Sequence, residues 1–165
     1  MTAALPNARF LFAHPAHFVA LGFGSGLAPF APGTFGTLVA IPIALLLHAT
    51  GSDPVFAAAI VVAFVAGGWA AELTGRHLAD ADHGSIVIDE IAAFLLILFL
   101  VGVEPLRVAI AFVLFRIFDI VKPPPIRKLD TVFKNGAGVM ADDAVAAVYT
   151  LVVFAVGQRL LGSFT

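Results

Sequence analysis

Acidic residues concentrate in three short segments of this sequence, at positions 82–90, 119–130 and 142–143. Each segment borders an apolar stretch that is long enough to enter a lipid bilayer. A charged side chain beside lipid is energetically costly, so acids in such positions usually mark a functional site. These carboxylates are therefore the first candidates for a chemical role.

Two pairs of neighbouring acids are candidate metal ligands, Asp89 with Glu90 and Asp142 with Asp143. Carboxylates are hard oxygen ligands, and Mg²⁺ and Mn²⁺ prefer such ligands together with water. We therefore expect these four residues to bind a divalent cation. The preference of acids for the positive ends of helices is the alternative explanation of both pairs. His83, close to the first pair, is either a general acid or base or an ordinary loop histidine.

Three charged residues recur at every third position near the end of an apolar stretch, Arg116, Asp119 and Lys122. This spacing places them on one helix face, where they either neutralise one another or face a ligand. The prolines at 123–125 should end that helix and hold Lys122 and Arg127 near the membrane surface. Cations beside a metal site suit a phosphate monoester, so we expect Arg116 and Lys122 to act in catalysis and Arg127 to bind phosphate. Asp119 is a further ligand, a general base or a nucleophile.

A glycine-rich stretch at positions 22–37 is the candidate anion-binding loop. Glycines allow consecutive backbone N–H groups to point inward, and such arrangements bind anions. Thr34 and Thr37 are placed to cap a helix whose positive end faces a phosphate. We expect Ser25, Gly33 and Thr34 to contact that phosphate. The alternative is a flexible linker followed by an ordinary helix cap.

The composition indicates a membrane protein. The chain has 165 residues, of which 61% are hydrophobic and 12% charged, and its mean hydropathy is +1.04. A soluble domain is roughly half apolar and about a quarter charged. We therefore expect one membrane-embedded domain covering residues 1–165. A net charge of −2 without a basic tract argues against a nucleic-acid partner, and the absence of cysteine excludes disulfides and thiolate chemistry.

The apolar stretches that must position these residues lie at about 34–50, 54–73, 86–101, 105–121 and 144–161. They do not alternate as barrel strands do, and several are shorter than the roughly 20 residues that cross a bilayer as a helix. The sequence therefore predicts an all-α, polytopic membrane bundle of about five short transmembrane or re-entrant helices.

The N-terminal stretch at 10–21 is apolar but is interrupted by His14, Pro15 and His17. This interruption disfavours a cleavable signal peptide. We expect an interfacial segment that lies along the membrane surface. The side chains expected to enter the headgroup region are Phe10, Phe12, Phe18 and Leu21.

Loop lengths predict which segments meet. The connections at 51–53 and 102–104 are tight, whereas those at 72–85 and 122–142 are long and polar. If all five stretches span, both long loops and the N-terminal region share one face, and of the eleven acids only Asp53 and Glu104 lie on the other. Most Lys and Arg residues also lie on the acidic face, so we expect this face to be cytoplasmic.

A carboxylate-based transporter or proton relay is the alternative class of function. Such proteins place acids near the bilayer midplane, often in broken helices or internal repeats. Here the acids gather at predicted helix ends, and no repeat is evident in the sequence. This placement favours an enzyme.

Four segments together resemble the phosphatidylglycerophosphatase A family: GFGSGLAPFAPGTFGTL at 22–38, DHGSIVIDE at 82–90, FRIFDIVKPPPI at 115–126 and GAGVMADDAVAA at 136–147. The resemblance implies a Mg²⁺-dependent phosphatase of phospholipid synthesis in the bacterial inner (cytoplasmic) membrane. Its lipid substrate would be phosphatidylglycerophosphate, and its products phosphatidylglycerol and inorganic phosphate. Another lipid or polyprenyl phosphate phosphatase is the alternative enzyme. The oligomeric state stays open.

Overall fold

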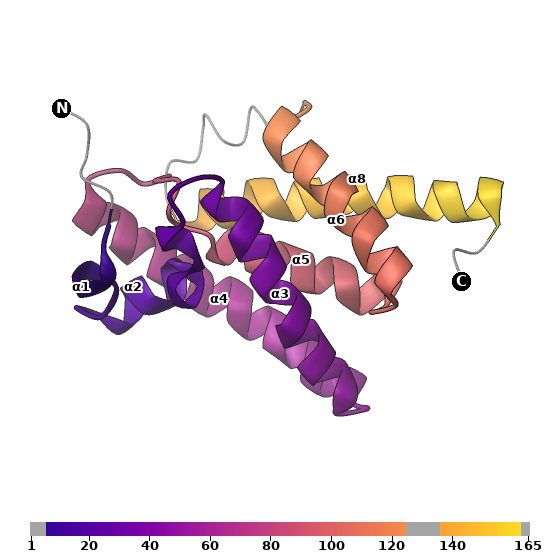
Figure 1. The fold of residues 1–165 in the computed structure, drawn as a ribbon, viewed down its shortest axis with the longest axis horizontal. Helices are drawn as coiled ribbons and strands as arrows, with labels where there is room; N and C mark the ends of the chain where they lie inside the picture. The colour runs from indigo at the N-terminus through magenta and orange to yellow at the C-terminus, as the bar shows by residue number, and fades with distance from the viewer. Residues whose placement is uncertain (1–5, 125–135, 163–165) are drawn as a thin grey trace.

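The computed structural model describes residues 6–124 and 136–162, and every element in these ranges is helical (Figure 1). Two short helices, α1 (Ala8–Leu11) and α2 (Pro15–Ala20), lead into the 3₁₀ segment η1 (Gly22–Leu27). The longer helices are α3 (Pro32–Ala49), α4 (Asp53–Leu78), α5 (Ile88–Val101), α6 (Pro105–Val121) and α8 (Gly136–Leu161). The all-α prediction is confirmed.

Each of the five apolar stretches forms a helix, but α8 begins earlier than predicted. It starts at Gly136 rather than near residue 144 and runs for 26 residues. Nearly two helical turns of glycine- and alanine-rich chain therefore precede Asp142 and Asp143. These acids lie inside a helix, so the interpretation that they sit at a helix start is wrong.

Helix α5 lies at the centre of the bundle and packs against α3, α4, α6 and α8 (Figure 1). Most of its side chains are buried, including Phe94 and Ile97, which are fully enclosed. Its 14 residues extend about 21 Å, less than the roughly 30 Å of a bilayer core. The neighbouring helices thus shield α5 from lipid.

Three helices are long and apolar enough to cross a membrane: α3, α4 and α8 over Gly136–Leu160. Their exposed side chains are largely apolar, as for Leu46 on α3, Val62 on α4 and Val152 on α8. The chain is therefore a membrane protein, although only three of the five predicted segments meet the length expected of a full span.

The N-terminal helices pack against α4 through a pair of histidines. His17 is buried, and its Nδ1 donates to the carbonyl of Phe10 at 2.8 Å. Its Nε2 is therefore an acceptor, and it faces Nδ1 of His77 on α4 at 2.7 Å. Burial lowers the pKa of His17, which favours this neutral form.

Because of this packing, only some of the side chains that we expected to enter the headgroup region are exposed. Phe12 and Phe18 are exposed, whereas Leu21 is fully buried and Phe10 stacks on His17 with ring centroids 4.0 Å apart. The expectation for Leu21 is therefore wrong, because this residue belongs to the core between α2 and the rest of the bundle.

Candidate active site

Three carboxylates from two helices meet where α5 begins. Asp89 and Glu90 lie in the first turn of α5, and Asp143 reaches them from α8. One oxygen from each lies within 4.8 Å of the others. Asp89 and Asp143 are almost fully buried, with 7% and 3% of their surface exposed. The helix packing thus concentrates negative charge in a space with little water.

Each of these carboxylates also has a buried oxygen without a hydrogen-bond partner: Asp89 Oδ1, Glu90 Oε2 and Asp143 Oδ2. Buried polar atoms in native proteins are nearly always paired, and unpaired carboxylates repel one another strongly at low dielectric. A divalent cation would offer these oxygens a partner and would offset most of the negative charge. The three residues therefore fit a metal ion.

Arg116 of α6 lies beside the three carboxylates. Its Nη1 pairs with Asp119 Oδ2 at 2.6 Å and lies 3.8 Å from Glu90 Oε1. The same nitrogen approaches the hydroxyl of Thr37 at 3.4 Å. Its Nε is buried without a hydrogen-bond partner. An unpaired guanidinium donor next to unpaired carboxylate oxygens is suited to an anion that bridges the arginine and a metal.

Gly33 allows the start of α3 to approach this cluster. A Cβ atom at this position would collide with Glu90 Oε1 and lie 3.2 Å from Arg116 Nη1. The backbone of α3 therefore forms one wall of the site. The predicted caps are wrong: α3 begins at Pro32 after Ala31 in a left-handed conformation, and Thr34 and Thr37 lie inside the helix.

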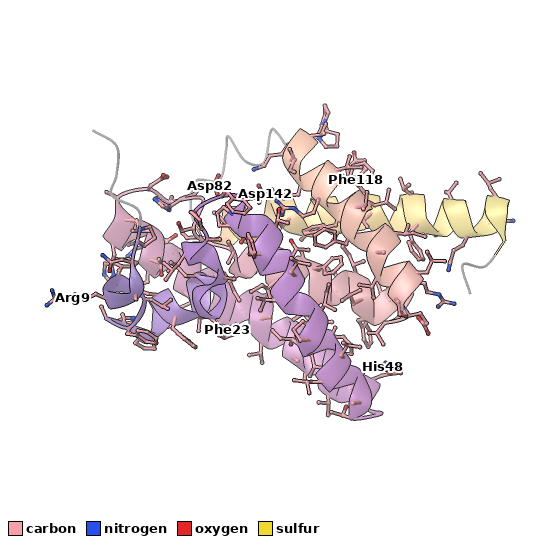
Figure 2. All side chains as sticks on the ribbon, viewed as in Figure 1. Arg9, Phe23, His48, Asp82, Phe118 and Asp142 are labelled. Carbon is pink, nitrogen blue, oxygen red and sulfur yellow. The ribbon has the colours of Figure 1, made fainter. Side chains whose placement is uncertain are left out.

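Lys122 enters the site from the end of α6. It adopts a left-handed conformation with φ of 45°, which ends the helix before the prolines. Its Nζ lies 2.8 Å from Asp142 Oδ2, while Asp142 Oδ1 accepts from the Asp143 N–H at 3.1 Å. Figure 2 shows Asp142 near the start of α8, far from His48 at the tip of the α3–α4 hairpin. Among the described residues, Asp142 is not part of the three-carboxylate group.

Two other predicted residues make local contacts. The Oγ of Ser25 donates to the Gly22 carbonyl at 2.8 Å, which stabilises the 3₁₀ segment. His83 Nδ1 accepts from the Ser85 N–H at 3.2 Å, within the turn that leads into α5. Arg127, predicted to bind phosphate, lies outside the described residues.

Glu72 of α4 is a supporting residue that the sequence did not reveal. Its Oε2 accepts from the N–H of Gly136, the first residue of α8, at 2.7 Å. Its Oε1 accepts from Arg76 Nε and Nη2 at 2.9 and 2.7 Å. Glu72 thereby fixes the N-terminal end of α8, the helix that carries Asp143. Only its position one turn before Arg76 was visible in the sequence, and that spacing is common on helix surfaces.

Comparison with known proteins shows which family the chain belongs to. A family profile described as Phosphatidylglycerophosphatase A matches residues 18–158, most of the chain. The chain belongs to the phosphatidylglycerophosphatase A family. A phosphatidylglycerophosphatase A of Haemophilus influenzae is 37% identical over 163 residues, which cover 98% of this chain and 100% of the relative.

Two further relatives of the chain come from other bacteria. A phosphatidylglycerophosphatase A of Escherichia coli is 37% identical over 143 residues, covering 86% of this chain and 83% of the relative. A putative phosphatidylinositol-3-phosphatase of Bacteroides thetaiotaomicron is 40% identical over 151 residues, which cover 87% of this chain and 94% of the relative. No solved structure matches the chain significantly.

We predict that Gly33→Ala strongly reduces phosphatase activity while the protein still folds. The added methyl group must displace Glu90 or the start of α3, because it would overlap the Glu90 carboxylate. Activity of the purified protein and its Tm are the two measurements. Gly84→Ala is the matched control, since a Cβ there meets nothing within 4 Å. Equal activity of the two variants would contradict the close approach of α3 to Glu90.

Proposed function

We propose that this protein hydrolyses phosphatidylglycerophosphate to phosphatidylglycerol and inorganic phosphate. Family membership supports the substrate and the reaction. The observation that carries the proposal is the group of three buried carboxylates beside Arg116, which provides ligands for a cation and a donor for an anion. All of this chemistry falls within one domain, residues 1–165.

Two cationic side chains would bind and neutralise the terminal phosphate of the lipid. Arg116 is held by Asp119 and Thr37, so its guanidinium is oriented before substrate arrives. Lys122 is held in the same way by Asp142. Phosphoryl transfer depends mainly on alignment and on neutralising charge at the phosphoryl oxygens. Cations fixed in advance offer this stabilisation without reorganising during the reaction.

We propose Asp89, Glu90 and Asp143 as the ligands of Mg²⁺. Hard carboxylate ligands and the need for a phosphate-bridging ion favour this metal. When bound, it would polarise the phosphoryl oxygens and lower the pKa of a bound water. We assign Asp142, predicted as a fourth ligand, to orienting Lys122.

Asp119 is our candidate for the proton-transfer or nucleophilic step. It either accepts the proton of the attacking water or attacks phosphorus itself, and both roles require an ionised carboxylate. The ion pair with Arg116 at 2.6 Å holds the Asp119 carboxylate in place beside the site. His83, whose Nδ1 is engaged in its own turn, would shape the loop before α5 or exchange protons through Nε2.

The placement of the site suits a phosphate on a lipid headgroup. The residues of the site lie near the beginnings of α3 and α5, the end of α6 and the first turns of α8, beside apolar helices that are long enough to span. A headgroup phosphate projects just outside the hydrocarbon core, so the enzyme can reach it without extracting the lipid. The positive-inside rule favours the cytoplasmic face of the bacterial inner membrane.

We predict that Asp143→Asn reduces Mg²⁺-dependent phosphate release in detergent by more than about 100-fold, because loss of a group that merely orients a metal ligand already costs about 10–100-fold. Asp89→Asn should behave alike. Mg²⁺ should also raise the Tm of the unmodified protein and have little effect on the Tm of either variant. Asp53→Asn, at the start of α4 on the opposite end of the hairpin, is the control and should retain both properties. Near-normal turnover of both site variants would exclude the proposed metal ligands.

A substrate panel tests the headgroup preference. Phosphatidylglycerophosphate should be the best substrate, ahead of phosphatidic acid, polyprenyl phosphate and phosphatidylinositol 3-phosphate. The last compound is included because the Bacteroides relative is named as a phosphatase of that lipid. Comparison of kcat/KM in the same detergent ranks the four. A higher value for any of the other three would reassign the substrate while leaving the phosphatase chemistry in place.

Labelling of single cysteines tests the proposed orientation, and the cysteine-free chain makes the experiment clean. Asp80→Cys reports the side where α4 ends, and Thr50→Cys reports the tip of the α3–α4 hairpin; both positions are exposed. A membrane-impermeant maleimide applied to spheroplasts should label position 50 and not position 80 until the cells are lysed. The reverse pattern would place the site on the outer side of the membrane.

A further inference from the structure

Three phenylalanines of the N-terminal region form a row on the outside of the protein. The ring centroids of Phe12 and Phe18 lie 6.0 Å apart, and those of Phe18 and Phe23 lie 5.5 Å apart. The exposed fractions of Phe12, Phe18 and Phe23 are 74%, 37% and 48%. A contiguous exposed aromatic surface usually marks a contact with lipid or with another protein. We call these three residues the aromatic row.

The backbone holds Phe23 in an unusual conformation. Its φ is 60°, between Gly22 at 54° and Gly24 at 107°. Glycine adopts such angles readily, whereas a bulky residue with positive φ is an uncommon and strained feature. This conformation keeps the Phe23 ring on the surface in contact with Phe18. Backbone strain that exposes an apolar ring indicates a role outside the core.

The aromatic row is joined rigidly to the segment that carries the carboxylates. The N–H of Val87, the residue before α5, donates to the Ala20 carbonyl at 2.9 Å. A Cβ on Gly22 would lie 2.6 Å from Val87 Cγ2, and a Cβ on Gly26 would collide with the Ser85 carbonyl. These close contacts fix the height of the row relative to Asp89, which lies two residues after Val87.

The charge and shape around the row fit a lipid surface. The chain contains no carboxylate side chain before Asp53, and the exposed Arg9 lies close in sequence to Phe12. Figure 2 shows Arg9 projecting from the N-terminal edge and Phe23 on the same part of the molecule. A shallow groove of about 420 Å³ runs past Phe12 and Phe18 beside Leu11 and Pro15. Exposed aromatic rings in a segment that carries a cation and no acid of its own are typical of membrane-interface anchors.

The η1 segment that carries Phe23 packs against the candidate membrane span α3, and a second pair of exposed rings lies at the start of that span. Phe30 is 68% exposed, and its ring lies 5.6 Å from that of Phe35 on α3. Helix α3 is long and apolar enough to cross a bilayer. The lipid leaflet that surrounds α3 is therefore the simplest partner for the aromatic row.

We infer that Phe12, Phe18 and Phe23 insert into the headgroup–acyl boundary of an anionic phospholipid leaflet and set the depth at which the three carboxylates lie. The span helices can slide and tilt by small amounts at modest cost. An interfacial anchor tied to Val87 removes that freedom at the level of the site. The lipid phosphate then meets the cluster at a fixed height, a consequence that rests on the proposed function.

Tryptophan quenching tests this inference independently of any enzymatic activity. The chain has one tryptophan, so Trp69→Phe provides a silent background for Phe23→Trp. The protein is reconstituted in vesicles of phosphatidylcholine and phosphatidylglycerol whose acyl chains carry bromine at a shallow or a deep position. We expect shallow bromines to quench the indole at position 23 more strongly than deep ones. Val62→Trp, on the exposed face of α4, should show the opposite order, and Asp80→Trp should show little quenching.

Two results would overturn the inference. Quenching at position 23 as weak as that at position 80 would place the aromatic row in water. Quenching at position 23 by deep bromines as strong as that at position 62 would place the row in the hydrocarbon core. In either case the proposed phosphatase reaction would be unaffected, because the site residues are not involved.

Kinetics supply a second test of the same surface. The triple variant Phe12→Ser, Phe18→Ser, Phe23→Ser should raise KM for substrate in vesicles about tenfold and leave kcat/KM for a short-chain, water-dispersed substrate unchanged. The triple leucine variant keeps an apolar surface and should restore most of the loss. Equal losses on both substrates would indicate a merely structural role and contradict the inference. An unchanged KM in vesicles would contradict it as well.

Discussion

The structure depends on holding three carboxylates together in a place with little water. Like charges a few ångströms apart repel strongly at low dielectric, and each also loses hydration energy when it is buried. Arg116 beside Glu90 offsets part of this cost, and the buried oxygens that remain without partners leave room for a cation to offset the rest. The same arrangement that is costly for folding is what a phosphate-binding metal site requires.

Close helix packing makes this concentration of charge possible. Gly33 brings the backbone of α3 against Glu90, and Gly136 brings the start of α8 against the Gly68 carbonyl and Glu72. In membranes, packing between helices relies on small residues that let backbones approach, because lipid is as apolar as the side chains it replaces. The glycines of the site have no side chain, and this absence lets the helix backbones approach one another closely. The charged residues are positioned by α3, α4, α6 and α8 around the central α5.

Much of the fold could be predicted from the sequence because lipid restricts the choices. A long apolar stretch in a bilayer must form a helix, so the five helices and the start of α5 near Asp89 followed from hydropathy alone. The start of α8 did not follow, because Asp142 and Asp143 separate the short apolar segment 136–141 from the long stretch at 144–161, and glycine disfavours a helix interior. That helix start is stabilised by Glu72 of α4, which accepts from its first N–H. The burial of Leu21 was equally invisible, since it depends on how α2 packs.

The sequence by itself determined which acidic and basic residues are candidates for the chemistry, and it predicted that they gather on one membrane face. Only the tertiary structure decided how these residues share the work. Neighbours on a helix point about 100° apart, so Asp143 faces Asp89 and Glu90 while Asp142 faces Lys122. Two adjacent aspartates look equivalent in a sequence. In the structure, the orientation of the helix against its neighbours gives them different partners. The contact of Thr37 with Arg116, across 79 positions, exists for the same reason.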